Sequence, residues 1–146
     1  MKCTVSWDGP NPEEPGRERQ VFVATTTELD GTLDQAESQA VAEQLPYAVH
    51  IDQARAAGSV MIGLGDEERA FIDWLTPEGR REYAFEPHIP TEGGSIAFDV
   101  DGDWRRHDPA ELRVTPMTAR QAAREYARTG ARPTCVEWAR PSDSPL

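Results

Sequence analysis

Hydrophobic and polar positions alternate with a period of two in several short stretches of the chain. Lys2 to Trp7 places Cys3, Val5 and Trp7 on one side and polar residues on the other, and this pattern predicts a first strand. Further strand-like runs, separated by short turns, are Gln20–Ala24, Tyr47–Asp52, Ser59–Leu64, Arg69–Leu75, Arg81–Phe85 and Ser95–Val100. Connections this short favour antiparallel neighbours.

Two other segments have the period of a helix. Apolar residues recur at helical spacing from Leu29 to Val41, with Thr26 or Thr27 as the expected N-cap and Pro46 beyond the end. A second helix is predicted from Ala119 to Thr129, with Thr118 as its cap and Gly130 after its last turn. Its arginines form a basic stripe at positions i, i+4 and i+8: Arg120, Arg124 and Arg128.

Asp101-Gly102 lies between two strand-like runs and predicts a two-residue hairpin turn, because a type I′ turn needs positive φ at both central residues. In that register Asp99 faces Trp104, so Trp104 lies on the face away from Ile96, Phe98 and Val100 unless a bulge intervenes. A closing strand is expected within Pro133–Ala139.

These elements predict one α+β domain over residues 1–146. Its main feature is an antiparallel sheet of about six to eight strands with two main helices packed on one face. Asp8–Arg19 is rich in proline and glycine and should form a loop, and residues 141–146 should be a frayed tail.

The net charge of −11 argues against direct binding to nucleic acid or to anionic lipid and favours a basic partner. The charge is uneven, with a net of −8 over Leu64–Trp104 and +4 over Arg105–Arg132. No stretch fits a signal peptide or a membrane span, so we expect a soluble protein of the cytoplasm, monomeric or weakly dimeric. Cys3 and Cys135 form neither a disulfide framework nor a zinc motif.

Residues that could carry catalysis are scattered. The histidines His50, His88 and His107 lie in unrelated segments without a metal-binding motif, and no serine lies in a nucleophile elbow. Asp99–Asp103 resembles a calcium loop, but its glycine comes at the fourth position instead of the sixth. We therefore expect no cofactor, no metal ion and no enzymatic activity.

With catalytic and metal-binding motifs absent, the main functional signal is a set of acidic residues interleaved with large aromatic residues. Aromatic side chains surrounded by charged groups are typical of a protein-binding surface. The alternative is that the rings belong to the core and the acids only solubilise the chain. The predicted partner-binding residues are Asp66, Glu67, Glu68, Asp73, Trp74, Asp99, Asp101, Asp103 and Trp104.

Four stretches of the chain form recognisable motifs: VSWDG (Val5–Gly9), SVMIGLG (Ser59–Gly65), DGDWRRHDP (Asp101–Pro109) and TARQAAREYARTGARPTCVEW (Thr118–Trp138). Together they resemble the first-described Imm family of immunity proteins from bacterial polymorphic toxin systems. The resemblance spans nearly the whole chain. It implies an α+β fold and tight binding to a cognate toxin encoded next door, and family members are typically linked to nucleic-acid deaminase toxins.

The expected function is thus neutralisation of a basic toxin protein, of the deaminase class, by covering its active site. No inhibitory residue is carried over from the family to a position in this chain. Two alternatives stay open: an acidic, non-enzymatic regulatory module for another basic protein, and an enzyme that uses an acidic pair.

Overall fold

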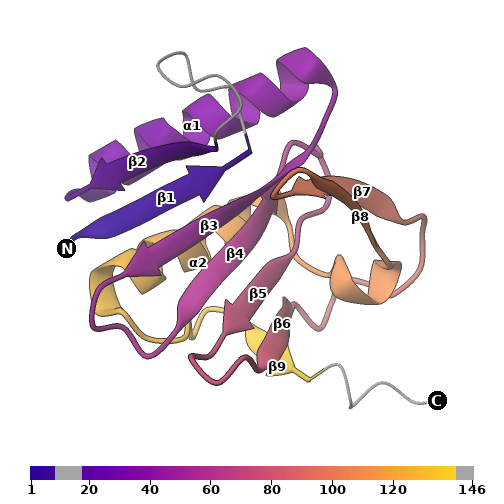
Figure 1. Cartoon of the computed structure of the whole chain (residues 1–146). Coiled ribbons are helices and arrows are strands. Elements are labelled where there is room, and N and C mark those ends of the chain that lie inside the picture. Colours follow the sequence, from indigo (N-terminus) through magenta and orange to yellow (C-terminus); the bar gives the residue numbers. More distant parts are fainter. Residues whose placement is uncertain (9–17, 141–146) are drawn as a thin grey trace.

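Nine strands form one sheet in the computed structural model, which describes residues 1–8 and 18–140 (Figure 1). The main path through the sheet runs β2-β1-β3-β4-β5-β6-β9 and is antiparallel throughout. The hairpin β7–β8 joins this path through one parallel residue pair between β3 and β7. The strands are β1 (Cys3–Trp7), β2 (Arg19–Val23), β3 (Tyr47–Gln53), β4 (Ser59–Leu64), β5 (Ile72–Leu75), β6 (Arg81–Phe85), β7 (Ile96–Val100), β8 (Asp103–His107) and β9 (Glu137–Ala139).

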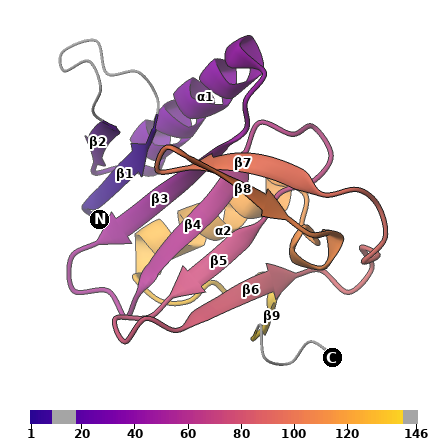
Figure 2. The same ribbon diagram turned by 45° about the vertical axis from the view of Figure 1, so that its right-hand side comes forward.

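Two helices, α1 (Thr26–Glu43) and α2 (Pro116–Thr129), lie side by side on one face of the sheet (Figures 1 and 2). The predicted α+β class and the one-sided helix layer are confirmed, with one strand more than the upper expectation of eight. Most of the expected loop Asp8–Arg19 and the expected tail 141–146 lie outside the described residues.

The main core fills the space between the helices and the sheet, because each strand turns alternate side chains toward α1 and α2. Val49 and Ile51 of β3 and Val60 and Ile62 of β4 are fully buried there. Full burial of each such side chain stabilises the fold by roughly 1.5–3 kcal/mol relative to leaving it exposed.

Both helices begin earlier than the sequence suggested. The N-cap of α1 is Thr25, not Thr26 or Thr27: its Oγ1 accepts from the Glu28 N–H at 3.1 Å, while the Glu28 carboxylate accepts from the Ala24 N–H. Thr25 and Glu28 thus have the spacing of a capping box, with the Glu28 carboxylate accepting from the N–H one residue before the cap.

The N-cap of α2 is Thr115, not Thr118. Thr115 Oγ1 accepts from the Thr118 N–H at 3.2 Å, and Pro116 occupies the first helical position. Proline suits that position because its missing N–H would have had no helical partner there. Gly130 ends the helix at φ 70°, as predicted.

The β7–β8 hairpin covers one end of the sheet face opposite the helices, and α2 lies behind the sheet in Figure 2. A second, smaller core forms beneath it, where the Phe71 ring stacks on His107 with centroids 4.1 Å apart and meets Phe98 edge-on at 4.9 Å. Gly63 is required here, because a Cβ at this position would lie 2.5 Å from the Phe71 ring.

The rest of this face carries two rows of side chains, which we call the open-face rows. The pairing register places them across β2, β1, β3, β4, β5 and β6, and nine of the twelve side chains are at least partly exposed. The first row is Gln20, Ser6, His50, Met61, Asp73 and Tyr83, and the second is Phe22, Thr4, Asp52, Ser59, Leu75 and Arg81.

Candidate partner-binding surface

The turn between β7 and β8 has the predicted geometry. Asp101 and Gly102 both adopt positive φ, at 55° and 91°, and the Asp99 carboxylate accepts a hydrogen bond from the Gly102 N–H at 2.8 Å. The register pairs Asp99 with Trp104, as expected, and the Trp104 ring is 63% exposed. The turn therefore presents acidic groups beside a large ring in solvent.

Further carboxylates approach this turn from other elements. Asp8, which follows β1, lies close enough to the turn that its pKa is raised, first by burial and then by Asp99 and Asp101. The Tyr47 hydroxyl donates to the Glu43 carboxylate, and its pKa is raised by burial, by Glu43 and by the charges of Asp99 and Asp8. Carboxylates from β1, α1 and β7 thus meet at the start of β3.

The loop between β4 and β5 reaches the same end of the sheet. A Cβ on Gly65 would lie 2.9 Å from Pro46, and the Pro46 carbonyl accepts from the Asp99 N–H at 2.8 Å. The loop continues through three acidic residues. We call the whole group the acidic end: Asp8, Glu43, Asp66, Glu67, Glu68, Asp99, Asp101 and Asp103.

His50 connects the acidic end to the open-face rows. Its Nε2 atom lies 3.2 Å from Asp101 Oδ1, so the turn rests against the first row of the sheet. This contact brings together residues 51 positions apart, and nothing in the local sequence around His50 indicated it.

Three buried side-chain atoms of the described residues make no hydrogen bond, and all three belong to the open-face rows. They are His50 Nε2, Asp73 Oδ2 and Arg81 Nε. Most buried polar groups in proteins are hydrogen-bonded, so a group of exceptions on one face is informative.

Asp73 is the most deeply placed of the three, with only 1% of its surface exposed. Its Oδ2 lies 3.8 Å from Arg81 Nε, whereas Arg81 Nη2 lies 2.6 Å from Glu111 Oε1. Burial raises the pKa of Asp73 to about 7, the Arg81 charge opposes this shift, and Glu111 adds to it. Arg81 is thus held mainly by Glu111.

A comparison with family models matched residues 17–140 to the family described as Immunity protein Imm1. The chain belongs to the Imm1 family of immunity proteins. The family that the sequence motifs resembled is therefore confirmed, and with it the general character of a toxin-neutralising immunity protein that binds a cognate toxin. Proteins of this family are generally not enzymes. A search of curated proteins found no match to the chain.

The predicted interface residues of this Imm1 protein fall into two groups. Asp99, Asp101, Asp103 and Trp104 lie together at the hairpin turn, and the loop acids Asp66, Glu67 and Glu68 belong to the same acidic end. Asp66 also holds its own loop, because its carboxylate accepts from the N–H groups of Glu68 and Arg69.

Asp73 and Trp74, the remaining two, are buried on opposite faces of β5. The Trp74 ring lies in the main core, 5.9 Å from the Tyr126 ring in an edge contact, and is 5% exposed. In this folded state a partner reaches neither side chain directly. The sequence-based list also lacked Asp8, Glu43 and His50, which only the tertiary fold brings to the site.

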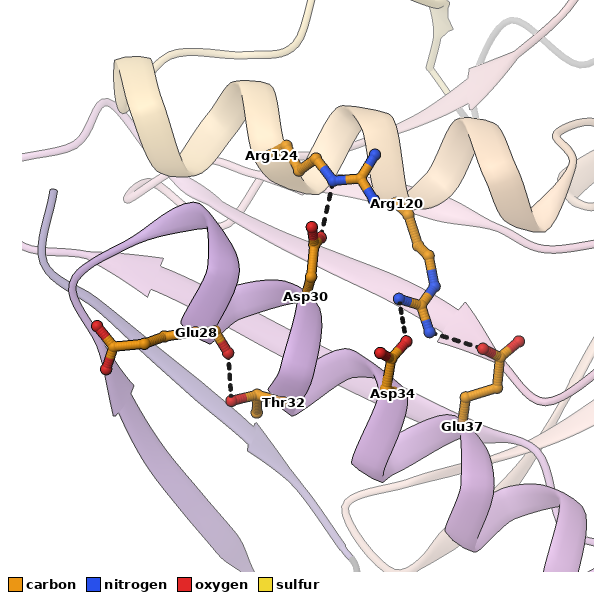
Figure 3. Close-up of polar contacts among 7 residues, drawn as sticks. All are labelled: Glu28, Asp30, Thr32, Asp34, Glu37, Arg120 and Arg124. Carbon is orange, nitrogen blue, oxygen red and sulfur yellow. Dashed lines mark hydrogen bonds and ion pairs between the residues drawn. The ribbon is translucent and has the colours of Figure 1, made fainter.

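The predicted basic stripe on α2 is largely neutralised by α1 (Figure 3). Arg120 lies 2.8 Å from Asp34 and 2.6 Å from Glu37, and Arg124 lies 2.7 Å from Asp30. Arg128 is exposed at the end of the helix. Apart from Arg128, the expected positive stripe is therefore an ion-paired seam between two helices.

Other chemistry finds little support in the part of the chain that the structure describes. No three His, Cys, Asp or Glu side chains of residues 1–8 and 18–140 are grouped to hold a metal ion. Burial raises the pKa of both free thiols, Cys3 and Cys135, which is the opposite of the shift that activates a nucleophile. Among the described helices, none has the length and apolar character needed to span a membrane.

Proposed function

We propose that this Imm1 protein neutralises a nucleic-acid deaminase toxin by covering the active site of the toxin with its acidic end. Family membership supports the toxin as partner, and the observation that carries the mode of inhibition is the gathering of carboxylates beside the exposed Trp104 ring. An enzyme that acts on nucleic acid needs a basic cleft, to which such a surface is electrostatically complementary.

The charges and the ring contribute in different ways. Electrostatic steering raises association rates by about 10–10³-fold at low salt, whereas ion pairs at the rim of an interface add only about 0–1 kcal/mol each. Affinity therefore depends on buried anchors, and Trp104 is the large side chain at the turn that can serve as one.

The direct test uses the toxin encoded beside the gene for this chain. Co-expression should restore growth of cells that produce the toxin, and the purified chain should inhibit deamination of a nucleic-acid substrate at a one-to-one ratio. Growth arrest despite soluble co-expression would reject the proposal. Recovery of a basic protein other than a toxin in a pull-down would favour the regulatory-module alternative.

Stopped-flow binding separates the roles of charge and ring. Replacing Asp101 and Asp103 with Asn should slow association and flatten its salt dependence, and Trp104→Ala should mainly speed dissociation. Asp99 is left intact because its carboxylate caps the turn. Met117→Ala, which removes another exposed apolar side chain on α2, is the control and should leave both rates unchanged.

A further inference from the structure

The face of the sheet opposite the helices is built differently from a face that is merely solvated. Met61 and Asp73 of the first open-face row are buried, whereas Phe22 and Asp52 of the second row are exposed. The face thus combines buried residues with one large exposed ring, Phe22, and aromatic side chains are enriched in protein interfaces.

The buried polar atoms that lack a hydrogen bond lie on the same face. His50 Nε2, Asp73 Oδ2 and Arg81 Nε are all in the open-face rows, and the helix layer of the described chain contributes none. His50 Nε2 faces the Asp101 carboxylate at 3.2 Å, and Asp73 Oδ2 and Arg81 Nε face each other at 3.8 Å, so each atom has a charged neighbour but no hydrogen bond. The His50 and Arg81 side chains are partly exposed, so a molecule lying on the rows can contact both.

The size of the face suits a protein partner. Six strands at about 4.8 Å spacing give the rows a width of about 24 Å. One side of a standard interface, about 800 Å², corresponds to a square roughly 28 Å on edge. Two rows of alternate residues extend about 13 Å along the strands, so they supply about 300 Å² of that area, and the adjoining acidic end must supply the rest.

We propose that the toxin lies across the open-face rows and against the acidic end, so that the sheet face, and not the helix layer, is the binding surface. This inference rests on the proposed function and adds where on the molecule the toxin is held.

Charge favours the toxin over a second copy of this chain as the occupant. The rows meet the acidic end at the contact between His50 and Asp101, and Arg81, the arginine within the rows, is already paired with Glu111. Two copies placed face to face would bring two acidic ends and two exposed Asp52 carboxylates into one interface, which costs free energy. A basic surface has no such cost.

The test compares the two faces with matched substitutions, using a catalytically inactive form of the toxin encoded beside this gene as the probe. Ser59→Lys adds a long positive side chain to the second row, and Ser38→Lys adds the same group to the exposed side of α1. We expect the Kd to rise about 100-fold for Ser59→Lys and to stay within about threefold for Ser38→Lys.

A second pair protects the test against misfolding of the Ser59 variant. Phe22 on the second row is 74% exposed and Met117 on α2 is 79% exposed, so replacing either with Ala removes little from the core. Phe22→Ala should raise the Kd at least about tenfold, and Met117→Ala should not. Circular dichroism and thermal unfolding confirm that each variant is folded.

The outcomes separate this inference from the proposed function. If the wild-type chain neutralises the toxin while Ser59→Lys and Phe22→Ala bind it normally, the sheet face is not the binding surface, although the proposed function stands. An equal loss on Ser38→Lys would place the toxin on the helices and overturn the inference. If the wild-type chain binds no toxin, both proposals fall together.

Discussion

Replacing the buried carboxyl of Asp73 with an amide should change how the stability of the protein depends on pH. The pKa of Asp73 is about 7 in the folded protein, against an ordinary value of 3.8. The folded state therefore binds a proton that the unfolded state has released, and Asp73 makes the protein less stable as the pH rises from about 4 to 7. The stability that the extra bound proton contributes is fully present below pH 3.8, the pKa in the unfolded chain. It is lost as the pH rises through about 7, the pKa in the folded protein.

The size of the effect follows from the same shift. One pKa unit corresponds to about 1.4 kcal/mol, so the two units between pH 5 and 7 amount to a loss of about 3 kcal/mol in the free energy of unfolding. The amide does not titrate in either state, so Asp73→Asn removes this pH dependence. The variant should gain about 3 kcal/mol more stability relative to wild type at pH 8 than at pH 5. Arg81 keeps its contact with Glu111 in the variant.

Urea unfolding followed by tryptophan fluorescence at pH 5 and pH 8 measures this difference. Contributions from other titrating groups cancel to first order when the variant is compared with wild type at each pH. Asp52→Asn, which changes an exposed carboxylate on the same face, is the control and should stay within about 0.5 kcal/mol at both values. An equal effect of Asp73→Asn at the two pH values, or a smaller gain at pH 8 than at pH 5, would show that the contact with Arg81 outweighs burial.

Two further pairs of substitutions test the packing that positions the proposed surface. Arg120→Met should lower the free energy of unfolding by about 1–2 kcal/mol, because it leaves two carboxylates of α1 unpaired. The control is Arg128→Met, at an exposed position of the same helix, which should change the free energy of unfolding by less than about 0.5 kcal/mol. Gly63→Ala should destabilise by about 1–3 kcal/mol through overlap with the Phe71 ring, and Gly31→Ala, with open space around its Cβ, should stabilise α1 by about 0.5–1 kcal/mol. Thermal unfolding measures both pairs, and effects of the opposite order would contradict the packing described.

The alternation of apolar and polar residues predicted most of the strands and the side of each that faces the core. It also predicted the outward position of Trp104, because a two-residue turn fixes the register of both strands at once. The expected helix caps were wrong, although the sequence carried a signal for both. Thr25 lies three residues before Glu28, the spacing of a capping box, and Pro116 after Thr115 suits the first position of a helix.

The candidate surface was harder to predict. Asp73 and Trp74 were both expected at the interface, yet neighbours on a strand point to opposite faces, so no single surface could have used both. That signal was present in the sequence. The approach of Asp8 and His50 to the hairpin turn had no local signal, since it depends on which strands become neighbours in the folded chain.

The arginine stripe of α2 also depends on tertiary structure. The sequence predicted its helical spacing, but its pairing with α1 depends on the two helices lying side by side. The net charge of +4 over Arg105–Arg132 therefore does not describe one positive face, because three of its arginines pair with carboxylates of other segments: Arg120, Arg124 and Arg132.

The two-residue period of the sheet has a consequence for how this protein can change over time. Val49, Ile51, Val60 and Ile62 turn toward the helices and hold the molecule together, while their immediate neighbours in the chain turn the other way. On the proposed binding surface, the residues that recognise the toxin therefore alternate along each strand with the residues that form the core. Substitutions on the outward positions can then change toxin recognition while the core residues stay the same.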